Sequence, residues 1–269
     1  MAFAKGAVGI AMAPAPKDVG ETLTRFVTFA WDLPDNDIAA RGNAMLYCDL
    51  YPKANPQGGS HAICSNLTAE VEALFAFAPN PGRSALYYVF AVMSSAAYLE
   101  TFECVLFASS DPSAPPRIPI AFDETVRARL CMHGAKLADY ENFQTEVTLL
   151  PSLVAAWPSG VTEISLRGFS YQEEPQALTL TGENMDSVVI SGVPARVMGT
   201  RIAGHPVIDK WLRERTAAYL RGTFKDSNVQ DLLDVISRIE RQHELLEKVD
   251  VEVTDLLTNG SFVRPAPLQ

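Results

Sequence analysis

Short apolar runs separated by turn-forming residues dominate the first part of the chain. The segments AVGIAM, RFVTFAW and AMLYCDLYP fall between residues 7 and 52, with clusters of Pro, Gly, Asn and Asp between them. Runs of this length, bounded by turn residues and containing β-branched and aromatic side chains, are typical of strands. We therefore expect residues 1–82 to form a β-rich part.

A longer apolar stretch follows. Residues 83–108 read RSALYYVFAVMSSAAYLETFECVLFA and contain no internal Gly or Pro, which predicts one long, buried helix. Residues 123–142 predict a second helix, with Val126, Leu130 and Leu137 on one side. Together with the following loop, these helices form a helical connector over residues 83–158.

A proline-rich segment lies between the two predicted helices. Pro115, Pro116 and Pro119 surround Arg117. Proline fixes φ and pushes the preceding residue out of helical space, so this segment should be extended. Such an extended segment either connects two parts of the protein or exposes Arg117 for a contact.

Strand-like alternation returns in residues 159–200. The segments EISLRGFSYQ, ALTLTG and SVVISG alternate polar and β-branched residues, with turn residues between them. This pattern predicts three short strands. We expect them to form a small antiparallel sheet.

Helical spacing dominates residues 201–269. Pro206 precedes an apolar stripe and suits the first position of a helix, where proline is tolerated. Ser227 and Gln230 have the spacing of a capping box at the start of another helix. A short heptad seam follows, long enough to pack along a partner helix; its positions are Val229, Leu232, Ile236, Ile239, His243 and Leu246.

These patterns predict an α+β fold, and the overall composition agrees with it. With 269 residues, 48% of them apolar, the chain can bury a substantial core. No window reaches about 18 consecutive apolar residues, so we expect no membrane span. The N-terminal apolar run contains glycines and lacks a cleavage context, so we expect a strand there and a cytoplasmic protein.

Charge is distributed unevenly along an acidic chain. The net charge of −10 argues against a protein that simply coats nucleic acid, because that affinity rests on many phosphate contacts. Residues 196–225 nevertheless hold seven basic and two acidic residues, a local patch that can attract an anion. The alternative is a solvated helix face whose basic side chains cover apolar surface.

Metal, cofactor and catalytic motifs are absent from the sequence. The four cysteines show no paired C-x-x-C spacing, which suggests free thiols in a reducing compartment. His61 with Cys64, or Cys131 with His133, could each supply two metal ligands, whereas zinc normally takes four. Phosphate-binding and dinucleotide-binding loops, a nucleophile elbow and a zinc-protease helix are also missing. We expect no metal, no cofactor and no catalytic residue.

Several segments, taken in order, match a known family. The chain resembles the C-terminal specificity region of type ISP restriction-modification enzymes, single-chain proteins that join nuclease, helicase, adenine-N6 methyltransferase and target-recognition parts. It departs from the family pattern at Met198, where a tryptophan is usual, and at Ala203, Gly204 and His205. The matching segments are GNAMLYCDLYP, ALYYVFAVMSSAAYLETF, PPRIPIAFDE, HGAKLADYENF, RIAGHPVIDKWLRER and the helix after Ser227.

The resemblance implies a non-catalytic DNA target-recognition module. It covers nearly the whole chain but begins partway through the recognition part, so residues 1–82 would be a truncated β-rich part whose loops read base edges. The expected partners are double-stranded DNA and either a methyltransferase/helicase polypeptide or a second copy. The basic patch would hold phosphates through Arg196, Arg201, Lys210, Arg213, Arg215, Arg221 and Lys225.

The resemblance also suggests a role for the proline-rich segment. In such proteins it marks the passage from the recognition part to the helices, so we expect Pro116, Arg117 and Pro119 to form a structural junction. Arg117 would then be a salt-bridge or carbonyl partner, with a DNA contact as the alternative.

Two other functions stay open. One is an interaction or scaffolding remnant that binds a partner protein through the C-terminal helix without DNA contact. The other is an independent enzyme, for which no nucleophile, base and orienting group can be picked out.

Overall fold

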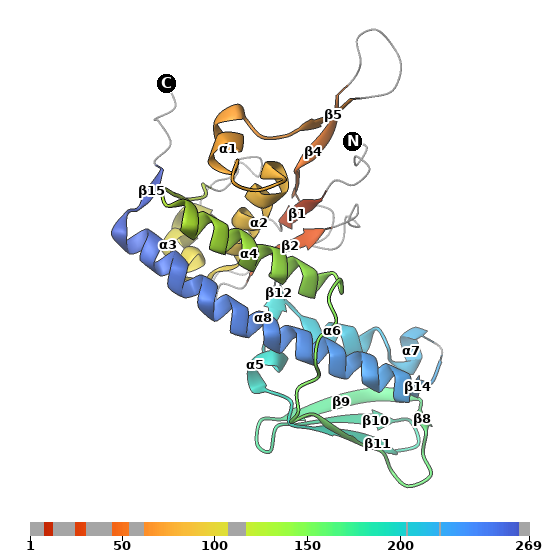
Figure 1. The fold of residues 1–269 in the computed structure, drawn as a ribbon. Coiled ribbons are helices and arrows are strands. Elements are labelled where there is room, and N and C mark those ends of the chain that lie inside the picture. Colours follow the sequence, from red (N-terminus) through yellow and green to blue (C-terminus); the bar gives the residue numbers. More distant parts are fainter. Residues whose placement is uncertain are drawn as a thin grey trace. The chain divides into compact units, whose positions relative to one another are not determined.

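The computed structural model describes residues 8–12, 25–30, 45–53, 62–106, 117–202, 204–220 and 222–263 (Figure 1). Helices and several small antiparallel sheets both occur, which confirms the predicted α+β class. The chain divides into two compact units. Unit 1 is Met1–Gln144 with Glu244–Gln269, and unit 2 is Thr145–His243. The predicted consecutive parts 83–158 and 201–269 are therefore each divided between the units.

The strands β1 to β4 of unit 1 lie in or overlap the segments predicted from the sequence, whereas β5 was not predicted. An antiparallel sheet has the order β2-β1-β3, and a separate antiparallel pair joins β4 to β5. A short helix was not predicted here: the Thr68 hydroxyl accepts the Val71 N–H at 3.5 Å and caps α1. The bounds are β1 Gly9–Met12, β2 Val27–Ala30, β3 Met45–Cys48, β4 Leu50–Lys53, β5 Ala62–Ser65 and α1 Ala69–Leu74.

The long helix predicted over residues 83–108 is wrong, because two helices occupy this segment. They are α2 (Pro81–Ser94) and α3 (Ala96–Leu106), and Ser95 between them has an extended backbone with ψ 133°. The Asp250 carboxylate accepts the Ser95 hydroxyl at 2.7 Å and the Ala96 N–H at 2.8 Å. A carboxylate here caps the start of α3, which makes the break favourable.

The second predicted helix is confirmed as α4 (Glu124–Glu141). Its N-cap, Asp123, accepts the Thr125 N–H at 2.7 Å. At its other end Glu141 holds β2, since its carboxylate accepts the Thr28 hydroxyl at 3.0 Å and the Phe29 N–H at 2.9 Å. The carboxylate also pairs with Arg25.

Two tyrosines hold the segment that enters α4. The Tyr88 hydroxyl donates to the Pro119 carbonyl at 2.7 Å, and the Tyr98 hydroxyl donates to the Arg117 carbonyl at 2.9 Å. The Arg117 side chain is exposed and has no partner among the residues that the structure describes. Its role as a salt-bridge or carbonyl partner stays a prediction, and Pro116 lies outside the described residues. The pair β6 (Ile120–Ala121) and β15 (Phe262–Val263) follows this segment.

Unit 2 contains the predicted small antiparallel sheet. All three predicted strand segments are confirmed, and a fourth strand extends the sheet to the order β7-β11-β10-β9. The start of the first segment instead forms β8, which pairs with β14. The bounds are β7 Val154–Ala156, β8 Glu163–Ile164, β9 Leu166–Gln172, β10 Ala177–Gly182, β11 Ser187–Ser191 and β14 Phe224–Lys225.

Short elements follow the sheet in unit 2. Pro206 has φ −68° and ψ 118°, an extended conformation, so it is the N-cap of α6 rather than its first helical residue. It also belongs to β13, which pairs with β12. The bounds are α5 Ala195–Met198, β12 Arg201–Ile202, β13 His205–Pro206, α6 Val207–Arg213 and α7 Ala217–Leu220.

The last helix, α8 (Asp226–Asn259), belongs to both units. It begins before the predicted capping box, which is therefore wrong. In the first turn of α8, the Asn228 side-chain oxygen reaches back and accepts the N–H of Lys225, the residue before the helix, at 2.9 Å. No helix in the described part of the chain is long and apolar enough to cross a membrane.

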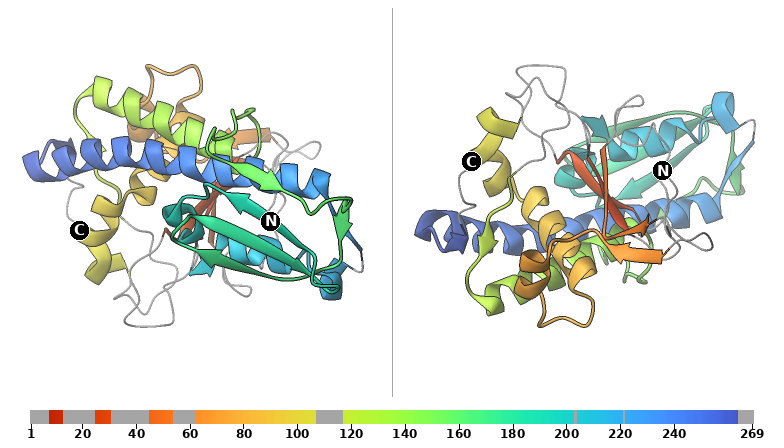
Figure 2. Two further views of the ribbon diagram at one scale, coloured as in Figure 1. Left: turned by 90° about the horizontal axis from the view of Figure 1, so that it is seen from below. Right: turned by 90° about the horizontal axis from the view of Figure 1, so that it is seen from above.

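The predicted seam packs within this chain and is not left for a partner helix. Its first four positions are buried against the sheet of unit 2 in one apolar cluster (Figure 2). Beyond Ile239 the buried face of α8 no longer follows the predicted seam. His243 and Leu246 are only partly buried, whereas Leu245 and Val249 are buried. The four buried seam residues are Val229, Leu232, Ile236 and Ile239.

Candidate nucleic-acid interface

The predicted phosphate contacts that the structure describes all lie in unit 2, on or beside α5, α6 and β14. Arg221 lies outside the described residues. The remaining six side chains fall into two groups. Some are bound into the fold by strong contacts, and the others are exposed with weak contacts.

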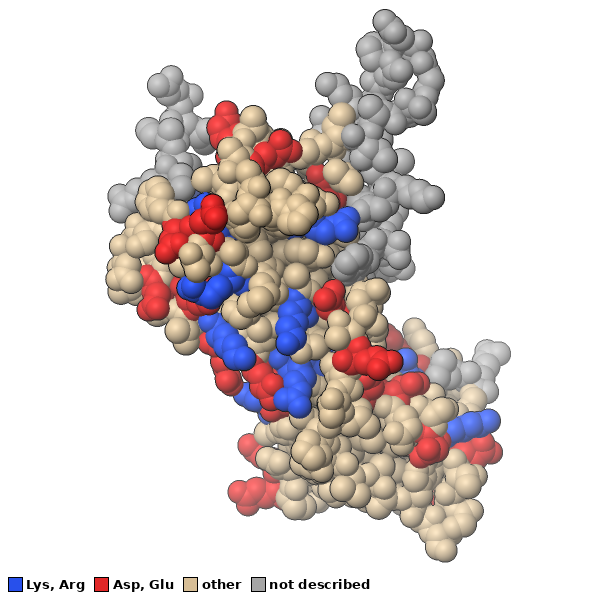
Figure 3. Space-filling view, viewed as in Figure 1, with Lys and Arg blue, Asp and Glu red and all other residues tan. Residues whose placement is uncertain are grey.

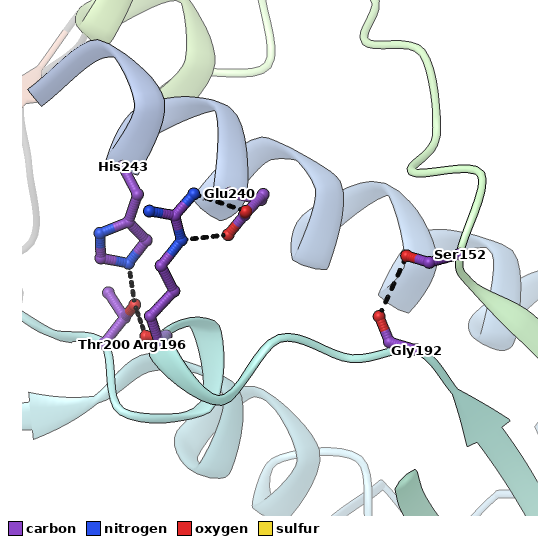
Figure 4. Close-up of polar contacts among 6 residues, drawn as sticks. All are labelled: Ser152, Gly192, Arg196, Thr200, Glu240 and His243. Carbon is purple, nitrogen blue, oxygen red and sulfur yellow. Dashed lines mark hydrogen bonds and ion pairs between the residues drawn. The ribbon is translucent and has the colours of Figure 1, made fainter. Parts of the chain in front are cut away.

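Arg196 is bound into the fold. Its guanidinium makes two hydrogen bonds to Glu240 of α8, at 2.8 Å from Nε and 2.6 Å from Nη2 (Figure 4). Bidentate pairs of this kind are the strong form of the arginine–carboxylate contact. Arg196 therefore holds α5 against α8 and is a poor choice for a phosphate contact.

Thr200 and His243 extend this contact. The Thr200 hydroxyl donates to the Arg196 carbonyl at 2.9 Å and lies 2.7 Å from His243 Nε2. A hydroxyl has a single proton. Because the hydroxyl donates that proton to the Arg196 carbonyl, it accepts a hydrogen bond from His243. This requires the imidazole ring to carry a proton on Nε2.

Gly192, which lies between β11 and α5, allows the backbone to turn before the helix that carries Arg196. Gly192 has φ +77°, and a Cβ at this position would overlap the Ser152 carbonyl. The Ser152 hydroxyl in turn donates to the Gly192 carbonyl at 3.2 Å (Figure 4). Glycine is the residue that adopts this conformation without strain.

Arg215 is also used by the fold. Its guanidinium stacks 3.7 Å from the centre of the Trp211 ring, and Nη1 donates to the Trp211 carbonyl at 3.0 Å. Burial lowers the pKa of Arg215, and the nearby Glu214 and Asp231 oppose that shift. The stacked guanidinium covers an aromatic face and stabilises the end of α6.

The two cations on the exposed face of α6 are held loosely. Arg213 Nε lies 2.6 Å from Asp209, and Lys210 Nζ lies 3.9 Å from Glu214, each pair one helical turn apart. The cationic side chains are 73% and 55% exposed, respectively. Exposed pairs of this kind contribute about 0.2–1 kcal/mol, so a phosphate can compete with the carboxylates.

Arg201 and Lys225 are likewise exposed. Arg201 Nη1 donates to the Gly204 carbonyl at 3.0 Å, and Lys225 Nζ lies 3.7 Å from Glu163 with 61% of its side chain exposed. The exposed group of predicted contacts is therefore Arg201, Lys210, Arg213 and Lys225.

Two members of this group, Lys210 and Arg213, line an open pocket. It has a volume of about 400 Å³ and combines cationic, acidic and aromatic side chains. Tyr219 of α7 is 72% exposed at its edge, where an aromatic ring can stack on a base or pack on a sugar. Tyr219 was not among the predicted contacts, although an aromatic residue just after a cationic helix is a signal that the sequence contains. The lining is His205, Pro206, Asp209, Lys210, Arg213, Glu214 and Tyr219.

The chain matches the model of a known protein family over most of its length. The model of the type ISP C-terminal specificity domain matches residues 16–248. The chain belongs to this family. No match was found among curated proteins.

Solved structures share the fold of this specificity domain. The type ISP enzyme LlaBIII bound to DNA gives a TM-score of 0.63 at 16% identity, covering 90% of this chain. A nuclease-deletion mutant of the type ISP enzyme LlaGI with a DNA substrate mimic gives 0.61 at 15% identity and 90% coverage. The DrdV–DNA complex gives 0.58 at 18% identity and covers 99%. The chain spans 16%, 21% and 26% of those three chains.

The possible metal ligands in the specificity domain do not form a site among the described residues. No group of three His, Cys, Asp or Glu side chains there could hold a metal ion. The Cys131 thiol donates to the Ser84 carbonyl at 3.1 Å, and burial raises its pKa to about 12. It is therefore a protonated core residue at neutral pH. His61 lies outside the described residues.

Proposed function

We propose that this chain is a non-catalytic DNA target-recognition module that gives sequence specificity to a restriction-modification methyltransferase and nuclease. The observation that carries the proposal is the match to the specificity-domain family over residues 16–248. The likeness to DNA-bound type ISP enzymes supports it.

The proposed mechanism separates positioning from reading. The exposed cations of unit 2, Arg201, Lys210, Arg213 and Lys225, bind phosphates and set the register on the duplex. We expect loops of the β-rich part to read base edges in the major groove, where each base pair has its own donor and acceptor pattern; the connecting segments 13–24, 31–44 and 54–61 lie outside the described residues. Arg196 and Arg215, which were predicted as phosphate contacts, are assigned to the fold instead.

The proposal includes partners and a compartment. The chain spans about a fifth of the type ISP enzymes it resembles, so a methyltransferase/helicase polypeptide is the proposed protein partner. The free thiols of Cys48, Cys64 and Cys131 fit a reducing compartment, and we place the protein in the cytoplasm.

Selection from a pool of randomised duplexes tests target recognition. The full chain is mixed with the pool, bound duplexes are recovered, and enrichment is read by sequencing. We expect one short sequence to be enriched over several rounds. Recovery of duplexes with no sequence preference would contradict the recognition role.

Substitutions at α6 test the phosphate contacts. Arg213→Gln should lower affinity and reduce the salt-dependence slope by about 0.9, the value for one lost phosphate contact. Asp209→Asn should raise affinity, because it removes the carboxylate that competes for Arg213. Titrations at several salt concentrations measure both effects. Equal slopes for Arg213→Gln and wild type would remove this residue from the interface.

A further inference from the structure

A second group of cations lies in unit 1, outside the stretch selected from the sequence. Arg129 and Lys136 are on α4, and Lys248 is on the part of α8 that belongs to this unit. Figure 3 shows basic side chains gathered over α4 and α8, with acidic ones beside them. We call Arg129, Lys136 and Lys248 the α4–α8 strip.

The strip is built on one face of each helix. Arg129, His133 and Lys136 are spaced by four and three residues, which places them on the same side of α4. Glu252 of α8 joins the helices, because its Oε1 lies 2.8 Å from Arg129 Nε and 3.6 Å from His133 Nε2. The strip therefore follows two helices that lie side by side in this unit.

The strip keeps positive charge that the fold does not neutralise. The carboxylate of Glu252 forms an ion pair with Arg129 and also contacts His133. Lys136 and Lys248 are exposed and form no ion pair with any of the residues that the structure describes. Lys136 makes only a cation–π contact, with its ammonium 5.8 Å from the centre of the Tyr140 ring.

Unpaired cations contrast with the overall charge of the chain. Because the net charge is −10, an anionic polymer is attracted only where cations gather locally. Lys136 lies seven positions after Arg129 on α4, which corresponds to a rise of about 10 Å along the helix axis. That is the axial rise of about three nucleotides of one DNA strand, at about 3.4 Å each.

We infer that the α4–α8 strip is a second phosphate-binding surface, which holds the sugar–phosphate backbone of duplex DNA through Lys136 and Lys248. The inference rests on the proposed function. Phosphate contacts carry no sequence information directly. The strip therefore adds affinity and leaves the recognised sequence unchanged.

The test compares two variants of the full chain that have the same net charge. Lys136→Gln with Lys248→Gln removes the two cations of the strip that form no ion pair, whereas Arg167→Glu replaces an exposed cation elsewhere with an acidic residue. The strip variant should bind DNA about tenfold more weakly at low salt, with a slope lower by about 1.8 for two contacts. The control variant should keep the wild-type slope.

Two further measurements make the result specific. Lys136→Arg with Lys248→Arg keeps both charges and should bind as the wild type does. Duplex selection with the glutamine strip variant should enrich the same sequence as the wild type. Thermal unfolding checks that each variant folds, and every substituted side chain is exposed in the structure.

The outcomes separate this inference from the proposed function. A wild-type chain that binds no duplex would overturn the proposed function itself. A wild type that binds, together with a strip variant of unchanged slope, would overturn the strip alone. Equal losses in the strip and control variants would assign the effect to net charge, and the strip would again be rejected.

Discussion

Gly134 lets the backbones of α4 and α2 approach closely. A Cβ at this position would overlap the carbonyl oxygen of Tyr87. The obstructing atom belongs to the backbone of a helix, so a rotamer change cannot relieve the overlap. The contact therefore fixes how α4, which carries Arg129 and Lys136 of the α4–α8 strip, packs in unit 1.

Gly134→Ala should lower the free energy of unfolding by about 1–3 kcal/mol, the usual cost of overpacking a tight contact. Denaturant unfolding measures it. Gly168→Ala is the matched control, because nothing lies near the added Cβ in strand β9. Equal stability of the two variants would contradict the close approach at Gly134.

His133 links stability to pH. Burial lowers its pKa below the ordinary value of about 6.5, and the charges of Lys248 and Arg129 act in the same direction. Glu252 opposes the shift. The unfolded chain therefore binds more protons than the folded chain just below pH 6.5, so stability falls as pH falls through this window.

His133→Gln should flatten that dependence. Free energies of unfolding measured at several values between pH 7.5 and about pH 5 should fall less in this variant than in the wild type. His205→Gln, at an exposed position, controls for histidine replacement in general. A wild-type curve that rises on acidification would contradict the lowered pKa.

Single residues also show why the site was only partly predictable. The excess of cations in residues 196–225 is visible in the sequence, and the exposure of Lys210 and Arg213 agrees with it. The role of Arg196 is not visible, because its partner Glu240 is 44 residues away. Pairing across such a separation depends on the tertiary fold.

At the scale of elements, the break between α2 and α3 depends on a distant side chain. Nothing in the sequence near Ser95 ends a helix, since Gly and Pro are absent from residues 83–108. The cap comes from Asp250, 155 residues further along. Local periodicity predicts that the segment is helical, but it cannot locate an interruption made by another helix.

Asp250→Ala should lower the free energy of unfolding by about 1–2 kcal/mol, because the Ser95 hydroxyl and the Ala96 N–H both lose their acceptor. Denaturant unfolding measures the change. Asp255→Ala removes an exposed carboxylate from the same helix and should have little effect. A smaller loss for Asp250→Ala than for Asp255→Ala would contradict the cap.

The C-terminal helix shows a similar limit. The 3–4 spacing predicts its buried face correctly from Val229 to Ile239, where the sheet of unit 2 covers it. The spacing does not reveal that the covering surface belongs to the same chain. Leu232 is fully buried in the core, so a charged residue there would disrupt the fold before it tested any partner.

At the scale of the whole molecule, the acidic composition constrains how DNA can be bound. A net charge of −10 repels a polyanion at long range. Binding then depends on short-range contacts at local cation groups, and such contacts weaken steeply as salt increases. The α+β class, the strands β1 to β4 and the strands β9 to β11 were predictable from the sequence. The division into two units was not, because one unit combines both ends of the chain.

Helix α8 supplies buried side chains to both units. Successive residues of an α-helix are rotated by about 100° and advanced by about 1.5 Å. Deleting one residue between Val229 and Leu232 would therefore turn Leu232, Ile236 and Ile239 away from the sheet of unit 2 that they now pack against. The spacing of these positions is thus fixed more strictly than their identities, and a one-residue deletion there should be tolerated less well than an apolar substitution.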